Sequence, residues 1–291
     1  MQRSVGARAF AVAVLILVVV FSASCLHARL SAGADNANTR EVSLIERLRG
    51  PRAGAHGGNV FSLKFDTMAG FEKAKVAGAD IVELDLRVSG EGIPVVYHDA
   101  ELSSRTNCRG YVSGLRLNEI QRCRFRLNRE HIPTFEEALR WSKGSIVVNA
   151  EFKEDAAIAP AVALIKQHDA YEWVYFQVKN WEQYKIARSI DAGVALLLTP
   201  ADGNDLDKIL SLQDDRVLVI ELNQTTRTKE NIDRIHAHGK FASEDVWHFV
   251  KTYELFGAAC TYAFDLGIDI AITNRALSCA KQRDAKKYSP R

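Results

Sequence analysis

From about residue 51 onward, short apolar runs alternate with stretches that place apolar residues at helical spacing. Most of the runs are rich in β-branched residues and contain few polar positions, as strands buried on both faces do. The predicted strands are 53–57, 81–86, 94–98, 145–152, 174–178, 194–199, 217–222, 240–243 and 269–273. The predicted helices are 67–77, 134–142, 156–168, 180–189, 205–212 and 229–237, with Lys, Asp or Gly near several of their ends.

Strands that alternate with helices predict a parallel sheet with helical crossovers, an α/β fold. Only seven residues separate strands 81–86 and 94–98, too few for a crossover, and the Ser-Gly-Glu-Gly segment at 89–92 is typical of a hairpin turn. Strand 94–98 is therefore expected to run antiparallel to its predecessor. The remaining eight strands match a single TIM-like (β/α)8 barrel, with a capping insertion at 99–133. An open doubly wound sheet is the alternative, although the chain has no Gly-rich dinucleotide loop.

The N-terminus is predicted to be an export signal. Arg3 and Arg8 precede an apolar run of 13 residues, 9–21, which is too short to span a bilayer and fits the apolar part of a signal peptide. Small residues then lead to Cys25, a pattern that resembles a bacterial lipoprotein cleavage site. We expect an exported protein that is periplasmic, membrane-tethered or secreted. The alternatives to lipidation of Cys25 are cleavage by a general signal peptidase and an uncleaved anchor.

The expected domain organisation follows once the export signal is set apart from the rest of the chain. Residues 1–24 are the signal peptide and residues 25–50, rich in Ala, Arg, Ser and Asn with little apolar periodicity, are a tether. The barrel domain is then 51–280, close to the size of about 250 residues that is typical of one (β/α)8 barrel, and 281–291 form a tail. A second domain is therefore not expected.

Composition and charge exclude several classes of protein. A chain that is 47% hydrophobic and 25% charged is neither disordered nor a small disulfide scaffold. The formal charge is +2, and the signal peptide carries two arginines and no acids, so the mature chain sums to zero. This balance gives no electrostatic case for a nucleic-acid partner. We expect a monomer, with membrane contact through an N-terminal lipid or an uncleaved anchor.

Four cysteines remain after the signal, and in an exported protein an even count permits two disulfides. Proximity in sequence favours the pairs Cys108–Cys123 and Cys260–Cys279 among the three possible connectivities. The alternative is four free thiols. A zinc site is not expected, because the chain has no CxxC pair.

Polar residues interrupt the predicted strands near their C-terminal ends. Glu83 and Asp85 stand two apart in strand 81–86, so both side chains point to the same face of the sheet. In a barrel, the C-terminal ends of the strands form the active-site face. The other polar residues near predicted strand ends are His56, His98, Glu151 and Lys153.

Three converging carboxylates, from Glu83, Asp85 and Glu151, repel one another unless a cation joins them or one of them binds a proton. Oxygen ligands suit Mg²⁺ or Ca²⁺, and two histidines beside such an ion suit general acid–base chemistry. The set therefore predicts a metal-dependent site for displacement at phosphorus. Each residue also has an ordinary interpretation, since one Glu or His at a strand end is more often a hydrogen-bonded structural residue.

At these positions the chain resembles the glycerophosphodiester phosphodiesterase family, across about residues 53–277. The central block, 78–99, is the most specific part, with Gly-Ala-Asp-Ile-Val-Glu-Leu-Asp-Leu at 78–86 and Ile-Pro-Val-Val-Tyr-His-Asp at 93–99. The other matching stretches are Ala-His-Gly-Gly at 55–58, Ser-Ser-Arg-Thr-Asn at 103–107, Ile-Pro-Thr-Phe-Glu-Glu-Ala-Leu at 132–139, Asn-Ala-Glu-Phe-Lys at 149–153 and Asp-Ile-Ala-Ile-Thr-Asn-Arg at 269–275.

The resemblance implies a function and a role for each residue. Members hydrolyse small glycerophosphodiesters to sn-glycerol 3-phosphate and an alcohol, and attack by a neighbouring substrate hydroxyl would first give a cyclic phosphate. The implied metal ligands are Glu83, Asp85 and Glu151. The implied acid–base pair is His56 and His98, with Lys153 as a contact of the phosphate or of metal-bound oxygens.

The chain also departs from the family pattern. Gly57 replaces the arginine of the family's His-Arg-Gly, and glycine cannot supply a bidentate contact to phosphate. The family's Glu-Asn-Thr corresponds to Phe-Asp-Thr at 65–67, and its final Thr-Asp to Thr-Asn at 273–274. We expect these changes to shift the substrate rather than abolish activity. The rival functions are a lysophospholipid-cleaving enzyme similar to spider-toxin phospholipases D, and a non-catalytic lipoprotein that binds phosphodiesters.

Overall fold

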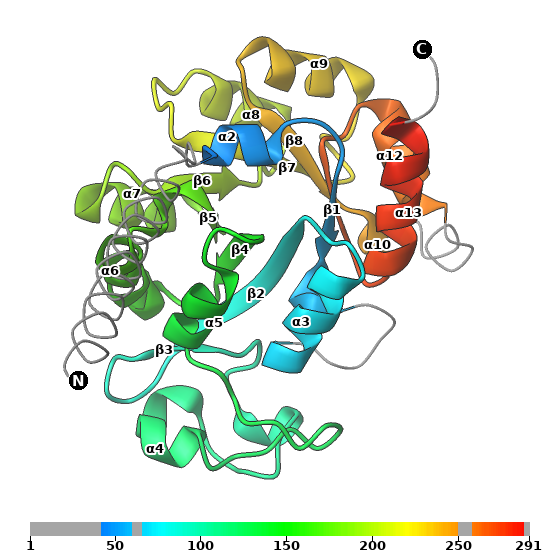
Figure 1. Ribbon diagram of the computed structural model, residues 1–291. Helices are drawn as coiled ribbons and strands as arrows, with labels where there is room; N and C mark the ends of the chain where they lie inside the picture. The colour runs from blue at the N-terminus through cyan, green and yellow to red at the C-terminus, as the bar shows by residue number, and fades with distance from the viewer. Residues whose placement is uncertain (1–41, 60–65, 250–257, 288–291) are drawn as a thin grey trace, which may run out of the picture. The chain divides into compact units, whose positions relative to one another are not determined.

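The computed structural model describes residues 42–59, 66–249 and 258–287. Within them, eight parallel strands close into a barrel ringed by helices (Figure 1). The ladder runs from β1 through β9, β8, β7, β6, β5, β4 and β2, and β2 pairs with β1 to close it. The strands are β1 Arg52–Ala55, β2 Ile81–Val88, β3 Pro94–Val96, β4 Val147–Phe152, β5 Val174–Val178, β6 Ala195–Leu198, β7 Val217–Leu222, β8 Phe241–Asp245 and β9 Ile270–Thr273. The predicted TIM-like barrel is thereby confirmed.

β3 is the one strand among these that runs antiparallel, and it pairs with the end of β2 through Leu86 and Val96. The predicted hairpin between them is therefore present. The helices are α2 Leu44–Leu48, α3 Met68–Val76, α4 Leu117–Ile120, α5 Phe135–Ser142, α6 Ile158–His168, α7 Trp181–Ile190, α8 Gly203–Leu210, α9 Lys229–Ala237, α10 Val246–Phe249, α12 Ala259–Leu266 and α13 Ala276–Lys287. Among the described residues, no helix is both long and apolar enough to cross a bilayer.

Side-chain caps define where several barrel helices begin. The Thr134 hydroxyl accepts the Glu137 N–H at the start of α5, and the Glu137 carboxylate accepts the Thr134 N–H in return, a capping box. At α8 the Asp202 carboxylate accepts the Asp205 N–H, so α8 begins at Gly203, earlier than the predicted 205–212. Capping residues thus fix where a helix begins, which the spacing of apolar residues alone predicts only imprecisely.

Helix α2 corrects the predicted tether. Leu44 and Leu48 are fully buried and pack against inward-facing side chains at the N-terminal end of the barrel, among them Ile81 and Val147. Residues from Val42 onward therefore belong to the barrel unit and not to a tether. The short amphipathic turn was missed because it carries only two apolar core positions. Residues 1–41, with the predicted signal and Cys25, lie outside the described residues.

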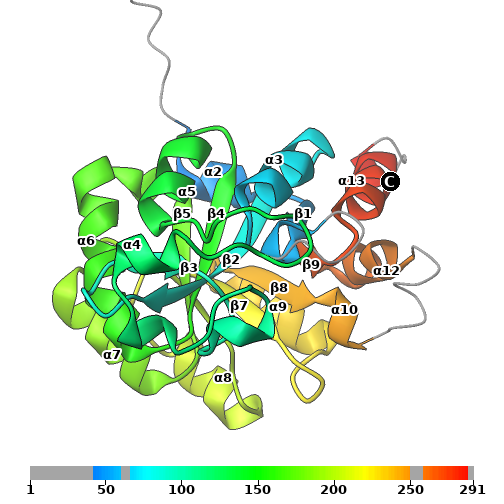
Figure 2. The same ribbon diagram turned by 90° about the horizontal axis from the view of Figure 1, so that it is seen from below.

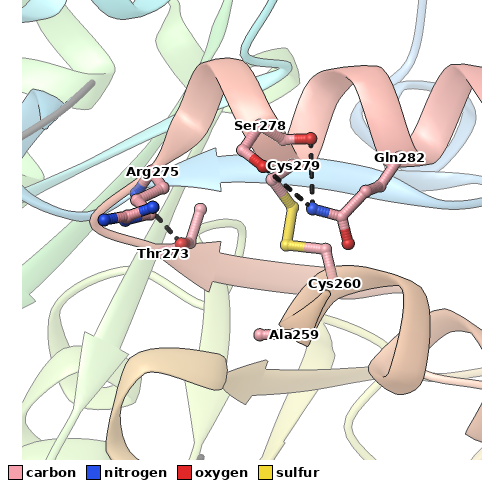
Figure 3. Close-up of a pocket in the computed structure, with 7 residues that line it drawn as sticks. All are labelled: Ala259, Cys260, Thr273, Arg275, Ser278, Cys279 and Gln282. Atoms are coloured by element: carbon pink, nitrogen blue, oxygen red, sulfur yellow. Dashed lines mark hydrogen bonds between the residues drawn. A yellow bond between two sulfur atoms is a disulfide. The ribbon is translucent and has the colours of Figure 1, made fainter. Parts of the chain in front are cut away.

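Helix α13 corrects the predicted tail, since residues 281–287 continue this helix. Buried Arg283 donates to the Gly78 carbonyl and pairs with Asp80 at the N-terminal end of β2. A disulfide between Cys260 and Cys279 joins α13 to α12, as predicted (Figure 3). The C-terminal helix is therefore bound to the barrel through a covalent link and an ion pair.

The insertion at 99–133 forms a separate small layer against β3 (Figure 2). It contains α4. Its buried residues Leu102, Ile120 and Phe125 form a small core together with Tyr97, which follows β3. The predicted disulfide Cys108–Cys123 closes this layer. Because the segment begins directly after His98, it lies at the end of the barrel where the predicted site residues converge.

Candidate active site

The structure brings the three predicted carboxylates together at the C-terminal ends of the strands. Asp85 of β2 stands in register with Glu151 of β4, and Glu83 stands two residues earlier on the same face. One oxygen from each of the three lies within 4.8 Å of the others. Glu83 and Asp85 are buried and Glu151 is partly exposed, so the cluster opens toward solvent on one side.

Two lysines border this cluster. The Lys153 ammonium lies 2.7 Å from Asp85 Oδ1 and 2.9 Å from Glu151 Oε2. Lys179, which follows β5, lies 2.9 Å from the other oxygen of Glu151 and is 43% exposed. Sequence reasoning named Lys153 and missed Lys179. The signal in the sequence that could have identified Lys179 was its position directly after the predicted strand 174–178.

The electrostatics of the cluster favour a bound cation. Burial, followed by repulsion from Asp85, raises the pKa of Glu83 well above its ordinary value. Burial also opposes ionisation of Asp85, but the Lys153 ammonium outweighs it and lowers the pKa of Asp85. Glu83 accepts the Gly57 N–H at 2.7 Å and has no ion pair among the described residues. Three clustered oxygen ligands with an incompletely neutralised carboxylate fit a hard divalent ion.

His56 begins a short 3-10 turn, His56–Gly58, directly after β1, and so lies just past the strand that was predicted to contain it. Its Nδ1 lies 2.9 Å from Asn274 Oδ1, and its ring stacks on Trp247 at 4.7 Å between centroids. Burial lowers the pKa of His56, although the bond to Asn274 and the charge of Asp85 oppose the shift. The Asn274 amide oxygen accepts a hydrogen bond from Nδ1–H, which makes Nε2 the unprotonated nitrogen of the neutral ring.

His98 follows β3 and has a different partner. Its Nδ1 lies 2.7 Å from Asp99 Oδ1, and the other Asp99 oxygen accepts from Ser104 at 2.6 Å and Arg105 at 2.8 Å. These hydrogen bonds outweigh partial burial and hold the pKa of Asp99 well below its usual range. Asp99 therefore stays charged and can pair with a protonated ring. Asp99 thus fixes the orientation of the His98 ring.

Gly57 adopts a backbone conformation that residues with a side chain rarely adopt. Its φ of 56° lies in the left-handed region, which glycine adopts without steric cost, and its N–H points at Glu83. The next residue, Gly58, also has positive φ, and a Cβ there would lie 2.5 Å from the Phe71 ring. The turn after β1 is thus shaped by two glycines against α3.

Asp66, which lies before α3, packs beside the carboxylates without joining the cluster of three. It is buried, its φ is 60°, and its Oδ1 accepts the Asp85 N–H at 3.2 Å. Burial and the nearby Asp85 raise its pKa well above the ordinary value. Asp66 therefore supplies a carboxyl group that holds the Asp85 backbone.

Sequence reasoning missed a polar wall formed by the later strands. Glu221 of β7 accepts from Thr199 at 2.7 Å and from Gln177 at 2.9 Å. Burial is the main cause that raises the pKa of Glu221 to about 7, and Asp245 of β8 hydrogen-bonds to it. For Glu221 and Asp245, the signal in the sequence was a polar residue near the end of a buried strand. Glu221 and Asp245 thus add carboxyl groups close enough to the carboxylate cluster to interact electrostatically with Glu151.

Sequence comparison places this geometry in a known family. A sequence model of the "glycerophosphoryl diester phosphodiesterase family" matches residues 56–275. A glycerophosphodiester phosphodiesterase of Caldanaerobacter subterraneus is 31% identical over 128 residues, which cover 41% of this chain and 53% of the relative. A bovine glycerophosphodiester phosphodiesterase 1 is 33% identical over 93 residues, 29% of this chain and 28% of its own. The chain spans about half the length of the bacterial relatives it matches.

Solved structures share the fold. A glycerophosphoryl diester phosphodiesterase of Parabacteroides distasonis superposes with a TM-score of 0.70 at 20% identity, covering 84% of this chain and 92% of its own. An Oleispira antarctica phosphodiesterase in complex with the product sn-glycerol-3-phosphate gives 0.66 at 20% identity, covering 81% and 97%. With the family match over most of the barrel, these findings establish that the chain belongs to the glycerophosphoryl diester phosphodiesterase family.

Proposed function

We propose that this protein is a phosphodiesterase that hydrolyses glycerophosphodiesters to sn-glycerol 3-phosphate and an alcohol. Family membership and the product-bound relative support the substrate class. The observation that carries the proposal is the pair of histidines, each held at Nδ1, beside a cluster of three carboxylates. Both His56 and His98 interact electrostatically with Asp85, so a phosphate at the cluster would contact both sides of this machinery.

The residues that would hold a divalent metal are Glu83, Asp85 and Glu151, and either Mg²⁺ or Ca²⁺ fits their oxygen set. When bound, such an ion neutralises phosphate charge and stabilises the charge that develops on phosphate oxygens. Lys153 and Lys179 add two ammonium groups at the rim of the cluster. Lys153 acts electrostatically on His56, the residue before Gly57, and so supplies positive charge near the position of the replaced family arginine.

The hydrogen-bond partners of the two rings support a different role for each. His56, neutral and bonded to an amide, takes a proton at Nε2 from the attacking hydroxyl. The new bond joins that oxygen to phosphorus, and the bond from phosphorus to the alcohol oxygen breaks. His98, paired with the charged Asp99, delivers a proton to the departing oxygen. The attacking oxygen comes from water in direct hydrolysis, and from a neighbouring substrate hydroxyl if a cyclic phosphate forms first.

The test is turnover of glycerophosphocholine by the purified protein, with and without a chelator. We expect glycerol 3-phosphate release that requires added Mg²⁺ or Ca²⁺. His56→Ala and His98→Ala should each lower kcat by at least about 100-fold, the usual contribution of a general acid or base, while the far-UV circular dichroism stays unchanged. Near-full activity in either variant would overturn the assigned acid–base pair.

The products distinguish direct hydrolysis from formation of a cyclic phosphate, and alternative substrates distinguish the proposed enzyme from its two rivals. Phosphorus NMR separates glycerol 3-phosphate from a cyclic phosphate. Turnover of lysophosphatidylcholine alone would favour the lysophospholipid enzyme, and tight binding of both compounds without turnover would favour a binding protein. We also propose that the protein acts outside the cytoplasm, which the two disulfides support because such bonds persist in oxidising compartments.

A further inference from the structure

The insertion carries a concentration of positive charge that the catalytic site does not use. Between residues 105 and 129 there are seven arginines and one acidic residue, Glu119, for a formal charge of +6. The whole chain carries only +2, so the remaining residues are net acidic. The arginine surface, as we name it, consists of the six exposed members of this group: Arg109, Arg116, Arg122, Arg124, Arg126 and Arg129.

These arginines lack acidic partners within the part of the chain that the structure describes. The seventh, Arg105, pairs with Asp99. Arginines of the barrel also pair with carboxylates, as Arg188 does with Asp214 and Arg227 with Glu244. In the arginine surface, Arg124 donates to two backbone carbonyls, and no member forms an ion pair with a described carboxylate. The cations are therefore available to an external anion.

The local fold turns the arginines of 122–126 outward and keeps Arg109 near them. Along 122–126, buried Cys123 and Phe125 alternate with exposed arginines, and the two-residue period of an extended chain puts those arginines on the side away from the core. The Cys108–Cys123 disulfide brings Arg109 alongside this segment. Six unpaired like charges repel one another, so the disulfide and the small core maintain an arrangement that charge alone disfavours.

An aliphatic side chain is exposed in the same segment of the insertion. Residues 125–130 form a tight turn closed by the Arg129 N–H to the Phe125 carbonyl and the Phe125 N–H to the Glu130 carbonyl. Leu127 stands in this turn beside Arg126 and is 68% exposed. An exposed leucine with arginines at 126 and 129 in the same turn matches the interface of a bilayer, where guanidinium groups bind phosphates and an apolar tip enters the headgroup region.

We propose that the arginine surface docks the protein on a bilayer that contains anionic phospholipids, with Leu127 entering the interface. The surface belongs to the insertion that begins at Asp99, one residue after His98, so docking would hold the catalytic end of the barrel close to the lipid. Charge complementarity favours an anionic membrane, and the aliphatic tip favours a membrane over a nucleic acid. The proposal concerns binding and holds whether or not the proposed hydrolysis is correct.

The test is co-sedimentation of the full chain with two kinds of vesicle. One kind is phosphatidylcholine alone, and in the other about a third of the lipid is phosphatidylglycerol. Any N-terminal anchor contributes to both, so the readout is the additional affinity for the anionic vesicles. We expect this increment in the native chain and its near-complete loss at about 0.5 M NaCl, where the Debye length is about 4 Å.

A charge-reversal variant and a matched control locate the effect. Arg109, Arg122 and Arg126 make no side-chain hydrogen bond within the described structure, and changing all three to Glu should reduce the increment on the order of 100-fold. The control changes three exposed lysines elsewhere, Lys166, Lys185 and Lys281, to Glu, and should retain most of it. Thermal unfolding checks that both variants fold.

Three results would overturn the proposal. The first is a native chain that binds both kinds of vesicle equally, and the second is a control variant that loses as much affinity as the insertion variant. The third concerns Leu127→Ser, which should weaken binding to anionic vesicles severalfold. An unchanged affinity in that variant, together with retention of a duplex DNA probe by the native chain, would assign the surface to a nucleic acid instead.

Discussion

At the residue scale, the two histidines differ in the group that holds Nδ1. Asn274 offers His56 an amide oxygen, whereas Asp99 offers His98 a carboxylate. A carboxylate stabilises a protonated imidazole ring more than an amide does. Asn274 and Asp99 would thus distinguish the proposed base from the proposed acid.

This difference predicts a pH effect. Burial lowers the pKa of His56 below its ordinary 6.5, so the neutral base persists in mildly acidic solution and the acidic limb of kcat/KM should lie below pH 6.5. Asn274→Asp places a carboxylate at Nδ1, raises the pKa of His56, and should move that limb upward by about one pH unit or more. The measurement is kcat/KM for glycerophosphocholine between pH 4 and 9. An unmoved limb would mean that another group titrates there.

At the element scale, a disulfide links the last two helices of the barrel. Cys260 lies in α12 and Cys279 in α13, both are buried, and 19 positions separate them (Figure 3). β9 lies between these helices in sequence and pairs with β1. The crosslink therefore joins the helices on either side of the last strand in the described part of the barrel.

Removing this link should destabilise the whole barrel. Cys260→Ala combined with Cys279→Ala should lower the free energy of unfolding by about 3 kcal/mol, because the unfolded chain regains the entropy of a loop of this size. Urea denaturation followed by circular dichroism measures the change. As a control, a reductant should destabilise the native protein more than it does this variant. An unchanged midpoint would show that ion pairs such as Arg283–Asp80 suffice to hold α13.

At the scale of the whole molecule, the barrel has two differently built ends. Apolar residues fill the N-terminal end, where α2 covers inward-facing side chains of several strands (Figure 1). Carboxylates and lysines occupy the C-terminal end, where β2 and β4 present Asp85 and Glu151 in register. The apolar end stabilises the barrel, and its stability compensates for the repulsion of charges gathered at the other end.

Helix α2 should therefore be necessary for stability. Leu48→Ala removes a fully buried side chain and should cost about 2–5 kcal/mol of unfolding free energy. Ile45→Ala on the exposed side of the same helix, where Ile45 is 41% exposed, should cost well under about 1 kcal/mol. Equal losses in the two variants would mean that helix propensity, and not packing under the barrel, explains the effect.

The sequence by itself determined the barrel, the hairpin of β2 and β3, both disulfide pairs, and six residues that the fold gathers at one end of the strands. These features follow from local rules, because β-branched runs, short linkers and strand alternation act over a few residues. The two-residue spacing of Glu83 and Asp85 required them to share a face whatever the rest of the chain did.

Only the tertiary structure decided the features that depend on contacts across the chain. Asn274 hydrogen-bonds to His56 although 218 positions separate them in sequence. Lys179, which follows the neighbouring strand β5, forms an ion pair with Glu151 of β4. The burial of α2, the continuation of α13 to residue 287 and the outward face of the arginine surface were equally hidden, since each depends on what packs beneath the segment. Local pattern fixes which way a side chain points along its own strand or helix. Closure of the barrel fixes which partner it meets there.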